Sequence, residues 1–211
     1  MAVIDGDVVM LTTDQAESTR GRILQAAYEQ MYANGFGGLR IEAVLKQTQL
    51  AKGALYHYFP TKLALGYAVL DEFIMVFFQQ TWSEFLAATN DPLLALNNFF
   101  QKKCRDVQAG ECFNGCPLGN LIQEMSTLDQ GFHQRFELVT HNIIAAVAGA
   151  LRQGQADGIV RQDINPEQMA AFLLASYQGI MGAIKFMKAE QLVSLFAALG
   201  DYIEDLRVLK S

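Results

Sequence analysis

Residues 40–63 have the sequence RIEAVLKQTQLAKGALYHYFPTKL, and this stretch decides the fold of the N-terminal part of the chain. Its apolar residues recur at helical spacing, which predicts two short helices that each bury one face. The second helix runs from about Lys52 to Tyr58, because Pro60 stops it. Two short helices with a tight connection are typical of a helix-turn-helix, which places its second helix in the major groove of DNA. The inward-facing residues are Ile41, Val44, Leu45, Leu50, Leu55 and Phe59.

The outward side of the second helix combines small residues with side chains that can donate hydrogen bonds to phosphate oxygens. Small residues let the helix approach a groove closely and allow contact with a thymine methyl group. Lys62 follows in the first turn of the next helix, where a cation opposes the helix dipole unless an anion binds beside it. The candidate DNA-binding residues are Arg40, Ala51, Lys52, Gly53, Ala54, Tyr56, His57 and Lys62.

The charge distribution indicates a polyanionic partner for the same stretch. The whole chain has a net charge of −6. Residues 18–65, however, contain six basic and two acidic residues, so this segment carries +4 and the remainder −10. A positive head on a negative body directs the head toward DNA. The basic residues are Arg20, Arg22, Arg40, Lys46, Lys52 and Lys62.

The segment KGALYHYFPTK at Lys52–Lys62, preceded by Thr19–Phe36, resembles the DNA-binding domain of Tet-repressor (TetR) family transcription regulators. The resemblance is specific over roughly residues 19–70 and one of layout beyond them. It implies a homodimer that binds a near-palindromic operator, with a phosphate contact at Lys62. It also implies an all-helical C-terminal body that binds a small-molecule inducer.

The segment departs from the family pattern at two places. A Ser or Thr usually caps the second helix of the domain, whereas this chain has Leu39 and Arg40 there. The connection has Gln49 where Gly is usual, and Ala51 where Ser is usual. Each lost cap costs about 1 kcal/mol, so we expect this helix-turn-helix to be less rigid than is typical.

The composition limits the class of protein. A length of 211 residues with 51% hydrophobic residues is sufficient for a sizeable core. No run of about 18 apolar residues is present, and the acidic start MAVIDGDVVMLTT does not resemble a secretory signal. Three cysteines, an odd number, favour a reducing compartment over a disulfide framework. We therefore expect a cytoplasmic protein without a membrane segment, a cofactor or a metal.

The predicted architecture is all-α, with about nine helices and no strand. An N-terminal arm at residues 1–17 precedes a three-helix helix-turn-helix domain at 18–64 and a ligand-binding and dimerisation domain at 65–211. A long helix runs from Thr61, at the end of the helix-turn-helix domain, to about Ala88 in the following domain. Asn165 caps another helix, which has Pro166 at its first position. The inducer pocket is expected among apolar residues of this domain, which periodicity cannot tell from core residues. They are Phe73, Phe77, Trp82, Phe100, Met125, Phe136, Tyr177 and Met181.

The last two predicted helices have faces suited to helix packing. Small residues repeat every four positions along the first, and a broad apolar face follows the second. A single subunit can use these faces internally, but the family resemblance implies a four-helix dimer interface. The residues are Ala171, Ala175, Gly179, Ala183, Leu192, Leu195, Phe196, Leu199 and Ile203.

Cys112 and Cys116 are the one pair of residues with potential covalent chemistry. Pro117 begins a helix, so Cys116 lies at its N-terminus, where unpaired N–H groups favour a thiolate. Cys112 is near enough in sequence to form a disulfide with it. Two packing cysteines without a redox role are the simpler interpretation, and the three-residue spacing is poor for zinc.

The leading hypothesis is a sequence-specific DNA-binding regulator, most simply a homodimeric repressor released by a small-molecule inducer, and not an enzyme. One variant makes Cys116 with Cys112 a sensor of oxidants or electrophiles. A second alternative, a helical thiol oxidoreductase, lacks a histidine near the cysteines. A third, a protein-interaction module, does not explain the outward Lys, Tyr and His side chains.

Overall fold

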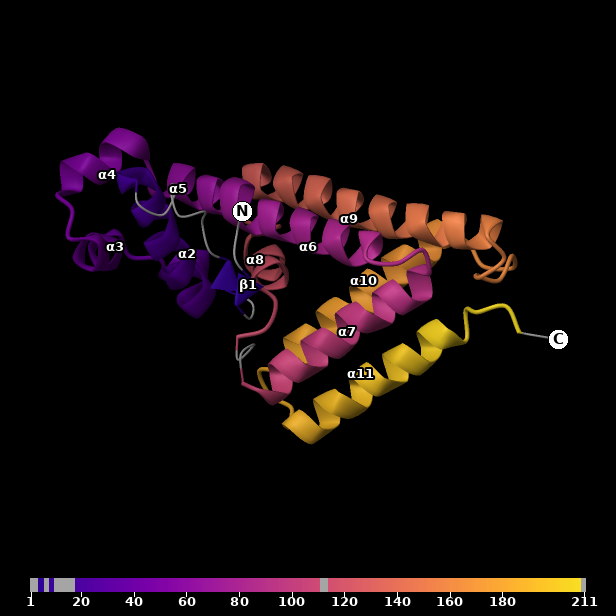
Figure 1. The fold of residues 1–211 in the computed structure, drawn as a ribbon. Coiled ribbons are helices and arrows are strands. Elements are labelled where there is room, and N and C mark those ends of the chain that lie inside the picture. Colours follow the sequence, from indigo (N-terminus) through magenta and orange to yellow (C-terminus); the bar gives the residue numbers. More distant parts are fainter. Residues whose placement is uncertain (1–3, 6–7, 10–17, 111–113, 210–211) are drawn as a thin grey trace. The chain divides into compact units, whose positions relative to one another are not determined.

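The computed structural model describes residues 4–5, 8–9, 18–110 and 114–209. These residues form nine helices if α5, η1 and α6 are counted as one continuous helix (Figure 1). The all-α class is thus confirmed. The predicted absence of strands was wrong in one detail, because β1 (Ile4–Asp5) and β2 (Val8–Val9) pair antiparallel within the N-terminal arm.

Contacts within the chain define two compact units. The first unit contains the described residues of 1–77 together with 117–138. It therefore joins α8 and the beginning of α9 to the predicted DNA-binding head, a grouping that the linear sequence does not suggest. Its helices are α2 (Thr19–Gly38), α3 (Ile41–Thr48), α4 (Lys52–Tyr58), α5 (Lys62–Val69), η1 (Leu70–Ile74), α8 (Pro117–Met125) and the start of α9 (Gln130–Ala156).

The helix α2 is interrupted at Gly35. Gly35 has φ 72°, a left-handed conformation that glycine adopts without steric cost. The chain then returns to helical geometry and reaches Gly38. One further helical turn therefore follows the left-handed glycine.

The continuous helix formed by α5, η1 and α6 (Met75–Ala87) spans residues 62–87, close to the predicted range. It is the one helix among the described residues that is long and apolar enough to cross a membrane by length and composition. Four of its large aromatic residues are nevertheless buried by the protein itself, as in a core helix. Phe73, Phe77, Phe78 and Trp82 are each at most 4% exposed. A π-helical segment, η1, interrupts its α-helical geometry and was not predicted.

The second unit contains the described residues of 78–116 and 139–211. Here α7 (Pro92–Gln108) and α11 (Ala189–Glu204) pack closely along their lengths, and α10 (Pro166–Ala183) contacts α11. The predicted cap of α10 is confirmed, because Asn165 Oδ1 accepts a hydrogen bond from Gln168 N at 2.9 Å. This unit holds most of the residues expected in the dimer interface.

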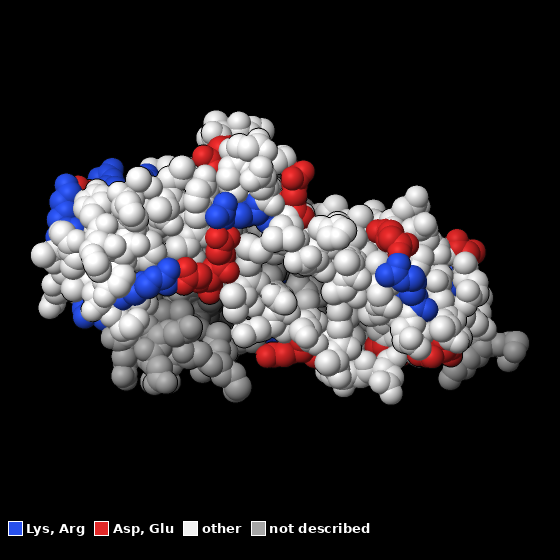
Figure 2. Space-filling model, turned by 90° about the horizontal axis from the view of Figure 1, so that it is seen from above, with Lys and Arg blue, Asp and Glu red and all other residues white. Residues whose placement is uncertain are grey.

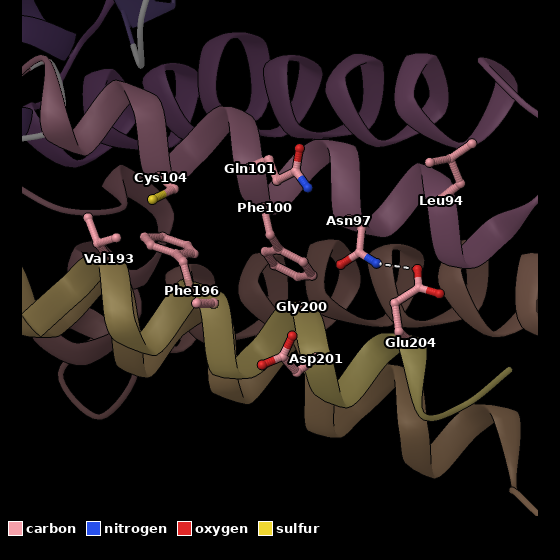
Figure 3. Close-up of a pocket in the computed structure, with 11 residues that line it drawn as sticks. Leu94, Asn97, Phe100, Gln101, Cys104, Val193, Phe196, Gly200, Asp201 and Glu204 are labelled. Atoms are coloured by element: carbon pink, nitrogen blue, oxygen red, sulfur yellow. Dashed lines mark hydrogen bonds between the residues drawn. The ribbon is translucent and has the colours of Figure 1, made fainter.

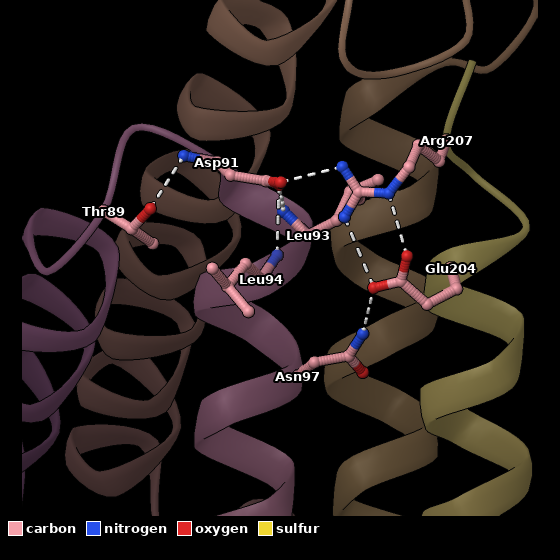
Figure 4. A network of polar contacts seen from close by, with 7 residues as sticks. All are labelled: Thr89, Asp91, Leu93, Leu94, Asn97, Glu204 and Arg207. Atoms are coloured by element: carbon pink, nitrogen blue, oxygen red, sulfur yellow. Dashed lines mark hydrogen bonds and ion pairs between the residues drawn. The ribbon is translucent and has the colours of Figure 1, made fainter. Parts of the chain in front are cut away.

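A polar network ties the beginning of α7 to the end of α11 (Figure 4). Arg207 Nη1 donates to Asp91 Oδ2 at 2.7 Å, and Arg207 Nε donates to Glu204 Oε2 at 2.9 Å. Asn97 Nδ2 donates to the other carboxylate oxygen of Glu204 at 2.7 Å. Arg207 therefore donates hydrogen bonds to two carboxylates, and Glu204 orients the amide of Asn97.

Candidate nucleic-acid interface

The helix α4 has the predicted bounds and the predicted inward face. Leu55 is fully buried, and Phe59, at the C-cap, is 2% exposed. These two side chains fix which side of the helix faces outward, because a seven-residue helix presents few other anchors. The lost caps are confirmed as well, since neither Ala51 nor Arg40 makes a side-chain cap hydrogen bond.

The connection between α3 and α4 contains Gln49 in a left-handed conformation, with φ 56°. Within the described ranges it is the one residue other than glycine with positive φ. A side chain in this conformation costs on the order of 1 kcal/mol, which explains why glycine is usual at this position in related domains. The turn is retained although the residue is unfavourable.

Two arginines of α2 hold the head together. Arg22 donates a hydrogen bond to the carbonyl of Thr48 at the end of α3. Arg20 pairs with Glu72 of η1, and its guanidinium carbon lies 5.0 Å from the centre of the Phe59 ring. The hydrogen bond that Arg20 donates to Glu72 is the main reason that the pKa of Arg20 is raised. These contacts place α3 and the end of α4 against α2.

The candidate DNA-binding residues form the outward surface of α4 and its flanks. Tyr56 is 37% exposed, and its ring lies 5.8 Å from the ammonium nitrogen of Lys52. Figure 2 shows Lys and Arg side chains gathered at the end of the molecule where α3 and α4 lie, with few acidic groups among them. Six candidates are exposed and two are half-buried. Exposed are Arg40, Ala51, Lys52, Gly53, Tyr56 and His57; half-buried are Ala54 and Lys62.

Gly53 has no structural need within the chain. Its φ is not positive, and a Cβ added there would meet no atom within 4 Å. A glycine inside a helix costs roughly 1 kcal/mol relative to alanine. The absence of a side chain therefore leaves space on the outer surface rather than inside the described part of the chain.

Lys62 already has a partner inside the head. Its Nζ donates to the carbonyl oxygen of Gly37 at 3.0 Å and lies 5.0 Å from the centre of the Phe36 ring. This lysine therefore supports the last turn of α2, a role that the sequence did not indicate. A phosphate contact at Lys62 stays a prediction.

Glu124 on α8 supports the same turn from the other side. Its carboxylate accepts hydrogen bonds from the backbone N–H of Phe36 at 2.8 Å and of Gly37 at 2.6 Å. A Cβ at Gly35 would lie 2.5 Å from this carboxylate, so a side chain there would displace Glu124 in addition to straining the positive φ. Sequence analysis missed Glu124, because its partners are backbone groups that lie 87 and 88 residues away.

Tyr58 was also missed as a candidate contact. It is 40% exposed, and its ring lies edge-on to His57 with centres 5.2 Å apart. Tyr58 follows Ala54 by four residues, so helical spacing alone could have placed it on the same side as the outward small residue.

Two family models match the chain. One is described as bacterial regulatory proteins of the tetR family and matches residues 23–69. The other is described as a tetracyclin repressor-like C-terminal domain and matches residues 92–199, more than half of the chain. The chain belongs to the TetR family. This TetR-family chain is a DNA-binding transcriptional regulator, and its helix-turn-helix is α3 with α4.

Relatives of known name agree with this assignment. The repressor DhaR of Mycobacterium sp. (strain GP1) is 26% identical over 172 residues, which cover 82% of this chain and 83% of DhaR. The repressor NemR of Escherichia coli K12 is 26% identical over 165 residues, covering 76% and 81% of the two chains. Both are named as helix-turn-helix transcriptional repressors.

Solved structures share the fold. The reduced form of E. coli NemR superposes with a TM-score of 0.78 at 22% identity and covers 90% of this chain and 98% of that one. A TetR regulator from Chloroflexus aurantiacus J-10-FL superposes with a TM-score of 0.82 at 20% identity, covering 94% and 100%.

The residues expected to bind an inducer are all buried, with exposed fractions of 6% or less. They fall in both compact units. In the second unit, Tyr177 lies 5.9 Å from Phe100 between ring centres. Trp82 has a buried indole N–H that has no hydrogen-bond partner in the described part of the chain. Phe73, Phe77, Met125 and Phe136 belong to the first unit, and Trp82, Phe100, Tyr177 and Met181 to the second.

Of the two cysteines in the sensor hypothesis, the structure describes Cys116. Cys112 lies outside the described residues. Cys116 is 2% exposed. The sensor stays a prediction.

The residues expected in the dimer interface divide into two sets. Four residues of α11 and one of α10 are buried inside the chain, so the subunit uses their apolar surface internally. Leu195 and the first three small residues of α10 remain exposed. A Cβ at Gly179 would meet nothing within 4 Å. The buried set is Ala183, Leu192, Phe196, Leu199 and Ile203; the exposed set is Ala171, Ala175, Gly179 and Leu195.

Proposed function

We propose that the protein is a homodimeric repressor that binds a near-palindromic operator in the cytoplasm and is released by a small-molecule inducer. The observation that carries the proposal is the outward surface of α4, where exposed Lys52, Tyr56 and His57 flank a glycine that the fold does not require. The names of DhaR and NemR support repression rather than activation. In this proposal Lys52, Tyr56, His57 and Lys62 contact phosphates, and Ala51, Gly53 and Ala54 approach the bases.

The substitution Gly53→Ala tests the close approach of α4. Alanine is the better helix former by roughly 1 kcal/mol, so the variant is expected to be slightly more stable. The added methyl group occupies space that the operator needs, so DNA binding is expected to weaken about tenfold. Binding is measured by fluorescence anisotropy on an operator selected from genomic fragments, and stability by thermal unfolding.

Gly149→Ala in α9 is the matched control, because a Cβ there also meets nothing within 4 Å. It should stabilise the protein without changing operator affinity. Equal affinity of Gly53→Ala and wild type would refute the close approach of α4.

The phosphate contact of Lys52 is tested by salt dependence. Each lost phosphate contact lowers the slope of log affinity against log salt by about one. Lys52→Ala is compared with Arg105→Ala, which removes a charge of the same sign from an exposed position of α7 in the second unit. An unchanged slope for Lys52→Ala would mean that this residue does not bind phosphate.

The proposed dimer interface uses the exposed apolar residues of α10 and α11. Phe172 is 50% exposed and Tyr202 38%, and their rings lie 5.2 Å apart. Leu195 is 37% exposed, and the small residues Ala175 and Gly179 allow a second helix to come close. An apolar surface of this kind on two packed helices is typical of a symmetric helical interface.

Phe172→Glu is expected to dissociate the dimer, because it places a charge in a desolvated interface. Sedimentation velocity measures the oligomeric state at several concentrations. Leu128→Glu is the control, since Leu128 is 73% exposed on the first unit. If Phe172→Glu stays as dimeric as Leu128→Glu, the interface lies elsewhere.

Trp82 supports an inducer site in the second unit. A buried donor without a partner is costly unless a ligand accepts its hydrogen bond. Trp82 is the single tryptophan of the chain, so its fluorescence reports directly on this region. Compounds that change its emission should also release the operator; compounds that release the operator without changing its emission would place the inducer elsewhere.

A further inference from the structure

A pocket opens between α7 and α11 within the second unit (Figure 3). Its volume is about 440 Å³, which falls in the range of small-molecule sites. Of the eight residues expected to bind an inducer, only Phe100 lines it. The pocket is therefore a separate feature of the body.

The floor of the pocket is apolar. Phe100 and Phe196 are 2% and 4% exposed, and Figure 3 shows their rings in the groove between the two helices. Val193 and the thiol of Cys104 line one end. Burial raises the pKa of the Cys104 thiol, so this end is neutral at physiological pH. These groups suit an aromatic or aliphatic body.

The opposite end of the pocket is polar and acidic. Asp201 lies at its exposed edge, and its carboxylate has no hydrogen bond or ion pair with the side chains that the structure describes. Glu204 shares Arg207 with Asp91, so this network of two carboxylates and one guanidinium retains a negative charge. None of the pocket-lining residues is basic. The local field therefore favours a cation.

Asn97 adds a directed acceptor. The residue is 8% exposed, and its Nδ2 donates to Glu204 at 2.7 Å. A carboxylate only accepts, so this bond fixes the amide with its nitrogen toward Glu204 and its oxygen the other way. Figure 3 shows that oxygen directed along the groove toward Phe100. It can accept a hydrogen bond from an N–H group inside the pocket.

Gly200 keeps the acidic end open. A Cβ at this position would lie 3.3 Å from Asn97 Oδ1, closer than ordinary contact. A larger side chain would cover the acceptor and fill the space between Asn97 and Asp201.

We propose that this pocket binds a small organic ammonium ion whose apolar body lies on Phe100 and Phe196. The ammonium group donates to Asn97 Oδ1 and pairs with Asp201. Neutral and anionic molecules of the same shape bind less well, because they leave the carboxylate unpaired or repel it. Binding of this ion does not depend on how the protein contacts its operator.

The test uses the full-length protein and three probes of one shape: 4-phenylbutylammonium, 4-phenylbutanol and 4-phenylbutanoate. Isothermal titration calorimetry is expected to rank the ammonium ion first and the carboxylate last. Asp201→Asn should weaken the ammonium ion roughly fivefold, the size of an exposed ion pair, and leave the alcohol unchanged. Asp205→Asn is the matched control, since Asp205 is exposed near the end of α11 and does not line the pocket.

A second readout locates the bound probe. The ammonium ion should slow alkylation of Cys104 by N-ethylmaleimide, followed by peptide mass spectrometry, in wild type but much less in Asp201→Asn. Gly200→Leu should abolish both binding and protection, and circular dichroism shows whether it folds. Equal affinity for all three probes, an Asp201→Asn variant that binds like wild type, or unprotected Cys104 at saturating probe would each overturn the proposal.

Discussion

The helices α4 and α11 use their surfaces in opposite ways. In α4, Leu55 is the one buried residue, and most of the remaining surface is polar, cationic or small. In α11, four large apolar residues are buried while further apolar side chains such as Leu195 and Tyr202 stay exposed. A short helix with a single buried anchor therefore presents a polyanion-binding surface, whereas a long helix that is apolar on more than one side serves both the core and a further contact.

The largest difference between the two helices is expected when their anchors are truncated. Leu55→Ala and Phe196→Ala should each destabilise the protein by about 3 kcal/mol, because both side chains are buried. Leu55→Ala should also abolish operator binding at temperatures where the protein remains folded, since α4 loses its main contact. Denaturant unfolding and anisotropy measure the two effects.

The proposed difference between α4 and α11 would be refuted if Phe196→Ala impaired operator binding as strongly as Leu55→Ala at an equal folded fraction. The buried side of α11 would then be no less important for DNA than the anchor of α4.

Glu124→Gln should have the next largest effect, and it acts on the head. Glutamine has a neutral amide in place of the carboxylate. One of the two backbone N–H groups would therefore lose its hydrogen bond, and the other would donate to an uncharged oxygen. We expect a cost of about 2 kcal/mol. Hydrogen exchange at the Phe36 and Gly37 amides should accelerate, whereas amides of α11 should not change. Uniform acceleration in both helices would show that the head is not supported separately.

Gln49→Gly should have a smaller effect of opposite sign. Glycine removes the cost of the left-handed conformation, so the variant should be more stable by about 1 kcal/mol. Thermal unfolding measures this gain, with Gln47→Gly in α3 as a control that should destabilise. A loss of stability in Gln49→Gly would mean that the Gln49 side chain makes a contact worth more than the strain.

The smallest expected effect concerns pH at the end of α11. Burial of Asp91 opposes its ionisation, but hydrogen bonds from Arg207 and the N–H groups of Leu94 and Leu93 outweigh it and lower its pKa. A carboxyl with a lowered folded-state pKa stabilises the protein above its unfolded pKa, and this stability disappears as pH falls through the folded value. Between about pH 6 and 3, wild type should lose about 2 °C more in Tm than Asp91→Asn. If Tm falls equally with pH in wild type and in Asp91→Asn, Asp91 is not the cause of the loss of stability in acid.

The sequence predicted the head more completely than the body, for a physical reason. In α4, one apolar side and one polar side leave a single way to orient the helix, so the outward residues apart from Tyr58 were identified from spacing. In α11 the apolar residues surround most of the helix, and periodicity could not decide which of them face α7. Leu192, Phe196, Leu199 and Ile203 were therefore assigned to the dimer interface although the subunit buries them.

Contacts between distant segments could not be predicted from spacing at all. Glu124 meets the turn after Gly35 because α8 packs on α2, and Arg207 meets Asp91 across 116 residues. The pocket between α7 and α11 depends likewise on the way that Gly200 lies against Asn97. Each of these features follows from tertiary packing, which local propensity does not contain.

The π-helical segment at Leu70–Ile74 concerns the number of residues in this helix rather than their identity. A π turn accommodates more residues than an α turn, and one residue of an α-helix corresponds to a rotation of about 100°. Deleting a single residue there would permit an unbroken α-helix and would leave Phe77, Phe78 and Trp82 close to their present directions, because the π turn already absorbs one extra residue. A one-residue deletion in this segment should therefore be tolerated better than a one-residue deletion in the α-helical parts of the same helix, which would rotate all following side chains by about 100°.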